Sequence, residues 1–168
     1  MRVKSIRLKH YDYKSNGYYF VTICTDYKKP YLEIPGVKDL VVAELARLNE
    51  LEGVELDYFV TMSNHIHLII ILDDSRFSLF EVVKRFKSKT TVLAKKLVNQ
   101  SWPNQNEAKQ AWQDKLNNAK QAWQLRGRLW QPNYYEHVIR NEAALDKIRA
   151  YIEINPDKEQ LMFDQFYQ

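Results

Sequence analysis

The chain has 168 residues, of which 45% are hydrophobic and 13% aromatic, so we expect one globular domain with a sizeable buried core. Its net charge of +4 permits a polyanionic partner without requiring one. Its single cysteine, Cys24, excludes an intrachain disulfide and is expected to be a core thiol. The sequence shows neither a signal-peptide pattern nor an apolar stretch long enough to span a bilayer, which predicts a cytoplasmic protein without a membrane partner.

The first half of the chain alternates between strand and helix patterns. Residues 18–25 are rich in aromatic and β-branched side chains and predict a strand, and residues 38–51 have the apolar spacing of an amphipathic helix. Residues 54–61 and 65–72 predict two further strands that are separated by a short turn at Ser63-Asn64. Because the turn is short, these two strands should pair as a hairpin.

The second half of the chain continues with a helix, a strand and a last helix. Residues 78–98 have helical apolar spacing, and Ser78 with Glu81 matches a capping box at the start of that helix. A fourth strand is predicted at 134–139, and a last helix follows at 142–154.

The order of these elements predicts the fold class. Strands and helices follow one another as β-α-β-β-α-β, and Asn141 is expected to cap the last helix. This order is typical of the ferredoxin-like fold, in which two crossover helices lie on an antiparallel sheet. We therefore predict an α+β protein with a ferredoxin-like core and an additional C-terminal helix.

Residues 99–126 fit no element of that plan. The hexapeptide at 108–113 recurs at 119–124, eleven residues later, which puts Trp112 and Trp123 on one face of a helix. We interpret 99–126 as a helical insertion within a single domain that spans 1–168. The insertion is either an arm that contacts DNA or a partner, or a spacer whose tryptophans pack on the body; the second reading is favoured.

Two histidines stand at the start of the third strand. His65 and His67 point to the same face, because side chains alternate along a strand. Two imidazoles on one face can bind one metal ion, although most such pairs are incidental. The spacing alone leaves both readings open.

The last helix offers two further polar side chains. Its apolar stripe comprises Leu145, Ile148 and Ile152, and Tyr151 and Asn155 lie beside the stripe at the edge that faces the sheet. The opposite face is expected to be solvated and carries Glu142, Asp146, Arg149 and Glu153. A metal ion held by two imidazoles and an amide oxygen keeps open positions for a phosphate. The alternative is a core tyrosine and a helix-terminal asparagine.

Several segments around these residues match a known family. Besides His65-Ile66-His67, the matching segments are Tyr11-Asp12-Tyr13, Gly17 to Thr22, Phe86-Lys87-Ser88, Trp130-Gln131, Tyr135-Glu136-His137, Ile139-Arg140-Asn141, Tyr151-Ile152 and Asn155-Pro156. In their order and spacing, the chain resembles the single-tyrosine HUH transposases, in particular the REP-associated tyrosine transposases. The resemblance covers most of 5–157 apart from the insertion.

This resemblance implies a ferredoxin-like core and an enzyme that cleaves and rejoins single-stranded DNA beside hairpins formed by palindromic repeats. Tyr151 would attack a phosphodiester and form a 5′-phosphotyrosine link, releasing a 3′-hydroxyl. His65, His67 and Asn155 would hold Mg²⁺ or Mn²⁺, and oxygen ligands such as Asn155 suit these hard ions. Relatives include homodimers that share the tyrosine helix between subunits, so a homodimer is one of the two open states, beside a monomer.

Basic residues in or near the matched segments are candidates for DNA contact, because cations that neutralise phosphates dominate such binding. The candidates are Arg7, Lys87, Lys89 and Arg140. Two other functions stay open at this point. The chain could be a module that binds structured nucleic acid without cutting it, or a related HUH nuclease of the replication-initiator or relaxase type.

Overall fold

The computed structural model of the chain describes residues 11–100 and 128–154, except for the side chains of residues 99, 100 and 154. Its centre is a four-stranded sheet. The strands are β1 (Gly17–Cys24), β2 (Val54–Thr61), β3 (His65–Leu72) and β4 (Tyr135–Ile139). They lie in the order β2-β3-β1-β4, and every neighbouring pair is antiparallel. This arrangement confirms the α+β, ferredoxin-like prediction and the hairpin of β2 with β3.

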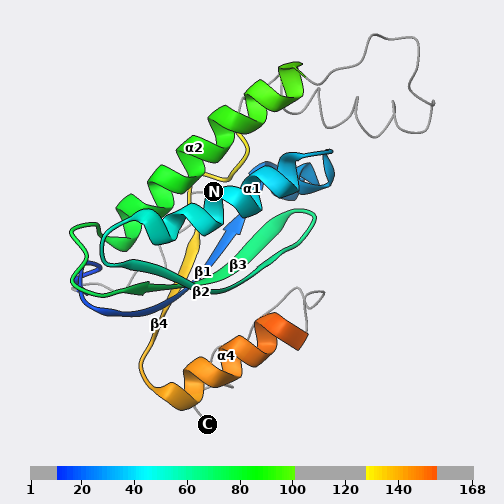
Figure 1. Cartoon of the computed structure of the whole chain (residues 1–168). Helices are drawn as coiled ribbons and strands as arrows, with labels where there is room; N and C mark the ends of the chain where they lie inside the picture. The colour runs from blue at the N-terminus through cyan, green and yellow to red at the C-terminus, as the bar shows by residue number, and fades with distance from the viewer. Residues whose placement is uncertain (1–10, 101–127, 155–168) are drawn as a thin grey trace, which may run out of the picture.

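Helices cover both faces of the sheet (Figure 1). The α-helices are α1 (Val37–Ala46), α2 (Leu79–Gln100) and α4 (Glu142–Ile154), and the short 3₁₀ helices are η1 (Asp26–Lys28), η2 (Tyr31–Glu33) and η3 (Arg47–Glu50). In Figure 1, α1 and α2 lie on one side of the sheet and α4 lies on the other. None of the helices in the described part of the chain is long and apolar enough to cross a membrane.

Strand alternation divides the buried side chains into two cores. Val21 and Leu68 belong to the larger core, under α1 and α2, whereas Phe20 and Ile69 belong to the smaller core, under α4. The smaller core is closed by the predicted apolar stripe of the last helix, Leu145, Ile148 and Ile152. The sheet therefore needs α4 to bury its second face.

The helix boundaries follow from local chemistry. The Ser78 Oγ accepts a bond from the Glu81 N–H at 3.4 Å, and the Glu81 carboxylate accepts one from the Ser78 N–H at 2.8 Å. The Asn141 Oδ1 accepts a bond from the Ala144 N–H at 2.8 Å, so both predicted caps are confirmed. The helix predicted at 38–51 was too long, because its last turn tightens into η3.

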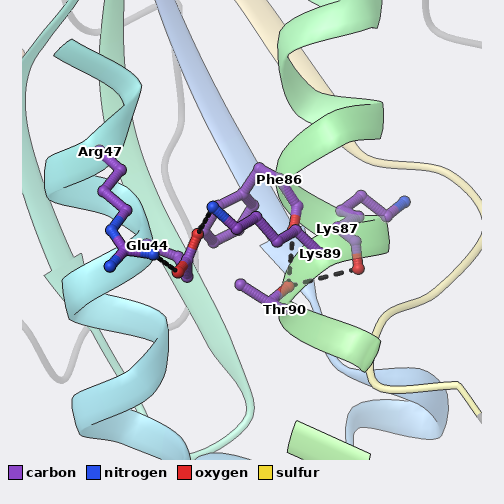
Figure 2. A network of polar contacts seen from close by, with 6 residues as sticks. All are labelled: Glu44, Arg47, Phe86, Lys87, Lys89 and Thr90. Carbon is purple, nitrogen blue, oxygen red and sulfur yellow. Dashed lines mark hydrogen bonds and ion pairs between the residues drawn. The ribbon is translucent and has the colours of Figure 1, made fainter. Parts of the chain in front are cut away.

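A polar network joins α1 to α2 (Figure 2). Glu44 is only 6% exposed, and its carboxylate pairs with the Arg47 guanidinium at 2.7 Å and with the Lys89 ammonium at 3.0 Å. In Figure 2, Lys87 leaves α2 on the side away from this network. The charge of Lys89 is therefore used within the fold, where it compensates a buried carboxylate.

The helix α2 continues to Gln100, into residues expected to belong to the insertion. The rest of the predicted insertion, with both repeated tryptophans, lies outside the described residues. Cys24 is half-buried rather than fully enclosed, and burial raises the pKa of its thiol. A protonated thiol agrees with a structural rather than a nucleophilic cysteine.

The prediction that Arg149 faces solvent was wrong. Its guanidinium donates two bonds to the Asp57 carboxylate, from Nε at 2.8 Å and from Nη2 at 2.9 Å. These hydrogen bonds, with the nearby carboxylates, raise the pKa of Arg149. Asp57 lies where the β2–β3 register shifts, between Leu56 and Phe59, and this irregularity in an edge strand cannot be deduced from helix periodicity. The pair ties α4 to the sheet.

Replacing Arg149 with methionine should lower the free energy of unfolding by about 2 kcal/mol, because the Asp57 carboxylate, 11% exposed, loses both of its donors. Lysine at this position should restore only part of that loss, since an ammonium cannot make the paired contact. Urea unfolding measures both effects. Asp146→Asn is the matched control, because Asp146 is 75% exposed and should contribute almost nothing. Equal losses for Arg149→Met and Asp146→Asn would contradict this account.

Candidate functional site

Three side chains predicted to work together lie close to one another on the α4 side of the sheet. The rings of His65 and His67, both on β3, are 4.7 Å apart, centre to centre, and meet edge to face. The ring of Tyr151, on α4, is 6.2 Å from the ring of His67. Strand alternation and the docking of α4 thus bring two imidazoles and a phenol to one place.

The orientation of His65 is set by the residue before it. The His65 Nδ1 lies 2.6 Å from the Asn64 Oδ1. An amide oxygen only accepts hydrogen bonds, so Nδ1 carries the proton in this contact and Nε2 keeps its lone pair. An imidazole in this tautomer is ready to bind a metal through Nε2.

The orientation of His67 is set across the sheet. Thr22 of β1 lies directly opposite His67 in the antiparallel register, and its Oγ1 is 2.8 Å from the His67 Nδ1. Burial, reinforced by the nearby His65, lowers the pKa of His67 to about 4, so its ring is neutral at neutral pH. Among the described residues, no group forms a hydrogen bond with the buried Nε2 of His67. An orphaned nitrogen of this kind suits a metal ligand.

Tyr151 is half-buried and packs against the smaller core. Burial raises the pKa of its phenol above the ordinary value, so the hydroxyl is protonated at neutral pH. A protonated phenol is a weak nucleophile. Chemistry at this oxygen therefore needs a neighbouring positive charge.

The third predicted ligand, Asn155, lies outside the described residues. Within 11–100 and 128–154, no third His, Cys, Asp or Glu joins the two histidines to form a metal-binding group. The described part of the chain therefore offers two candidate metal ligands, the imidazole nitrogens of His65 and His67.

The basic residues predicted to contact DNA have different surroundings. The Lys87 ammonium is turned inward and donates to the carbonyls of Gln131 at 2.6 Å and Pro132 at 2.9 Å. Burial lowers the pKa of Lys87 to about 8, which leaves the ammonium form dominant at neutral pH. Lys89 pairs with Glu44, as described above. Arg140 is exposed between β4 and α4, whereas Arg7 lies outside the described residues.

Lys87 supports a short segment that we name the 131–134 arch. Trp130 forms an isolated bridge with Thr25, and Tyr135 pairs with Thr22, but the four residues between them leave the sheet. The Lys87 Nζ reaches into this gap and holds the arch by its carbonyl oxygens. A basic residue on a helix therefore has a structural contact here that helix periodicity did not predict.

The partners of the two histidines were not predicted as site residues. Asn64 was interpreted only as a turn residue, although its position next to His65 could have indicated the contact. Thr22 is 45 residues from His67 in the sequence, and only the register of β1 with β3 brings them together. Sequence periodicity indicates the face of a strand but not its register with a distant strand.

Comparison with known proteins identifies the family of the chain. The sequence model of the family described as "Transposase IS200 like" matches residues 13–116, which is more than half of the chain. The chain belongs to the IS200-like transposase family. The chain is also 30% identical to an uncharacterised protein of Haemophilus influenzae, with 96% of this chain and 93% of that protein covered.

Two solved structures share the fold with this IS200-like family member. One is a REP-associated tyrosine transposase bound to a REP hairpin, with a TM-score of 0.55 and 19% identity over 90% of this chain and 72% of that chain. The other is a protein of Deinococcus radiodurans described as a transposase, with a TM-score of 0.51 and 20% identity over 88% and 95% of the two chains. At these identities the likeness supports the fold alone.

Replacing Lys87 with methionine should lower the free energy of unfolding by about 1 kcal/mol, because the arch carbonyls lose a charged donor and only part of that loss is recovered from water. Guanidinium unfolding measures the change. The matched control is Lys84→Met on the same helix, whose exposed side chain should contribute less than about 0.5 kcal/mol. If Lys87→Met were as stable as the control, the supporting role of Lys87 would be refuted.

Proposed function

We propose that this chain is a metal-dependent transposase and endonuclease that cleaves and rejoins single-stranded DNA next to hairpin-forming repeats. The observation that carries the proposal is the meeting of His65, His67 and Tyr151 on one face of the sheet. Membership of the IS200-like family and a fold shared with a transposase bound to a REP hairpin support the same reaction class.

The metal would be Mg²⁺ or Mn²⁺, held by the Nε2 atoms of His65 and His67, with Asn155 as the third protein ligand. The buried Nε2 of His67 has no hydrogen-bond partner among the described residues, which fits this role, and so does the neutral form of its ring. When bound, such an ion would polarise the target phosphate and stabilise negative charge on its oxygens.

Tyr151 would be the nucleophile. Its Oη would attack the phosphorus of a phosphodiester and lose its proton to water, since the side chain is only half-buried. The P–O bond to the 3′ oxygen would break and that oxygen would take a proton from water, leaving a 3′-hydroxyl and a 5′-phosphotyrosine. Attack of a 3′-hydroxyl on that link would re-form a phosphodiester and release Tyr151, so rejoining needs no external energy source.

DNA contact by Arg140 and Arg7 remains part of the proposal, with Arg140 exposed just before the tyrosine helix. Lys87 and Lys89 would contribute to the local potential, although their ammonium groups already contact protein oxygens. A homodimer and a cytoplasmic location also remain predictions.

Tyr151→Phe should abolish covalent attachment to DNA and leave DNA binding within about twofold of the wild type, because phenylalanine keeps the ring and removes only the attacking oxygen. The assay incubates the protein with Mn²⁺ and a labelled single strand from a palindromic repeat flanking the gene, and looks for a protein–DNA band on a denaturing gel. Tyr27→Phe, at a side chain that is 59% exposed on η1, should form the adduct normally.

An adduct that persists in Tyr151→Phe would overturn the assignment of the nucleophile. Binding of the hairpin strand by the wild type without any adduct would instead indicate a module that holds nucleic acid without cutting it. Nicking without rejoining at a repeat boundary would favour a replication-type or relaxase-type nuclease.

Thr22→Val should weaken Mn²⁺ binding about 10- to 100-fold, because the hydroxyl that orients the His67 ring is lost while the shape of the side chain is kept. Isothermal titration of the protein with Mn²⁺ alone measures the affinity without reference to activity. Thr91→Val is the control, since within the described part of the chain the Thr91 hydroxyl bonds only to the Lys87 carbonyl of its own helix. Equal Mn²⁺ affinity in both variants would contradict the orienting role of Thr22.

A further inference from the structure

A cavity of about 880 Å³ lies between α2 and the segment 128–136, outside the histidine pair. We name it the α2 groove. In Figure 1, the chain that leads into β4 runs beside α2, and this segment forms the second wall of the groove. The mechanism described above assigns the groove no role.

The groove exists because the 131–134 arch leaves the sheet. Gln131 still donates its N–H to the Cys24 carbonyl at 2.9 Å, so the base of the arch stays attached to β1. The Trp130 Nε1 donates to the Thr90 Oγ1 at 2.8 Å, which fixes the same segment to α2. With Lys87 also holding the arch, both walls are held at a set distance and the cavity is built into the fold.

One wall is a stripe of α2 that would be expected to face solvent. It includes Phe80, Lys84, Ser88 and Val92, four residues apart and therefore on one helix face about 18 Å long. Phe80 is 45% exposed and Val92 is 52% exposed, although both are large and apolar. The Lys84 ammonium lies 5.9 Å from the centre of the Phe80 ring.

The opposite wall has matching chemistry. Tyr134, Tyr135 and the exposed Arg128 are among its lining residues. Among the described residues, the charged side chains that line the groove are Lys84, Lys87, Arg128 and the buried Glu136. Cations therefore outnumber anions, and Lys84 and Arg128, both exposed, stand on opposite walls.

Accessible aromatic rings interleaved with cations are the features by which proteins hold unpaired nucleic acid. Bases stack on the rings while phosphates pair with the cations, and neither contact requires a particular sequence. A base-paired duplex hides the base faces that such rings need. The groove thus suits a single strand better than the stem of a hairpin.

The groove borders the strand that supports the candidate site. Thr22 lines the groove, and its hydroxyl bonds the ring of His67. By register the Thr22 side chain lies with His67 on the α4 face, so the groove and the candidate site border the same strand, β1, from opposite faces of the sheet.

We propose that the α2 groove binds the unpaired DNA segment next to the hairpin, on the face of the sheet opposite to His65, His67 and Tyr151. This proposal rests on the proposed function, because it supplies the path of the DNA that Tyr151 would cut. Phe80 and Tyr134 stack against bases, and Lys84 and Arg128 pair with phosphates on either side.

The test measures the binding of fluorescein-labelled oligothymidine, which forms no hairpin, by fluorescence anisotropy. Phe80→Ala combined with Lys84→Gln should raise the Kd about 10-fold or more, because a stacking platform and a phosphate contact are both lost. Arg128→Gln should also weaken oligothymidine binding. It should reduce the slope of log Kd against log salt concentration by about one, because one phosphate contact is lost. The matched control, Tyr27→Ala combined with Lys96→Gln, also removes an exposed ring and a charge but lies off the groove and should change the Kd less than about twofold.

Covalent adduct formation distinguishes this proposal from the proposed function. Groove variants should form the Tyr151 adduct poorly at low DNA concentration and recover at saturating DNA, because they do not alter the attacking oxygen. If oligothymidine binds the groove variants and the wild type equally, or does not bind the wild type, the groove proposal is overturned. If the groove variants bind oligothymidine more weakly than the wild type does, but the wild type never forms an adduct, the groove proposal is upheld and the proposed cleavage is rejected.

Discussion

The antiparallel register of β1 with β3 is the constraint on which the rest of the candidate site depends. It puts Thr22 directly opposite His67, so that a hydroxyl meets Nδ1 and leaves Nε2 buried without a hydrogen-bond partner among the described residues. A shift of this register by one residue would move both histidines to the face under α1 and α2. There they would be buried among aliphatic side chains, away from Tyr151.

The second constraint is the attachment of α4. The sheet has two apolar faces, and the smaller core can be buried only when α4 packs on it. The paired contact of Arg149 with Asp57 anchors the same helix to the edge strand β2. Packing on one side and a charge-assisted bond on the other therefore hold Tyr151 beside His67, which links the stability of this face to the geometry of the candidate site.

Local signals in the sequence predicted the elements and the caps, because strand alternation, helical spacing and capping act between near neighbours. They also predicted that His65, His67 and Tyr151 would meet, once the family resemblance supplied a reason. They did not predict the contacts that depend on distant register or irregular backbone. Thr22 beside His67 requires the pairing of two strands, Asp57 beside Arg149 requires a register shift, and Lys87 under the arch requires a segment to leave the sheet. Asn155 and Arg7, which lie outside the described residues, stay predictions.

The central claim is that the two histidines and the tyrosine act together on one phosphate. A crystal structure of the Tyr151→Phe protein with Mn²⁺ and a hairpin-bearing single strand tests it most directly. The account predicts an anomalous manganese peak bonded to the Nε2 atoms of His65 and His67, with a DNA phosphate beside the metal and facing the ring of residue 151. A manganese ion bound elsewhere, or a phosphate bound far from that ring in every subunit, would contradict it.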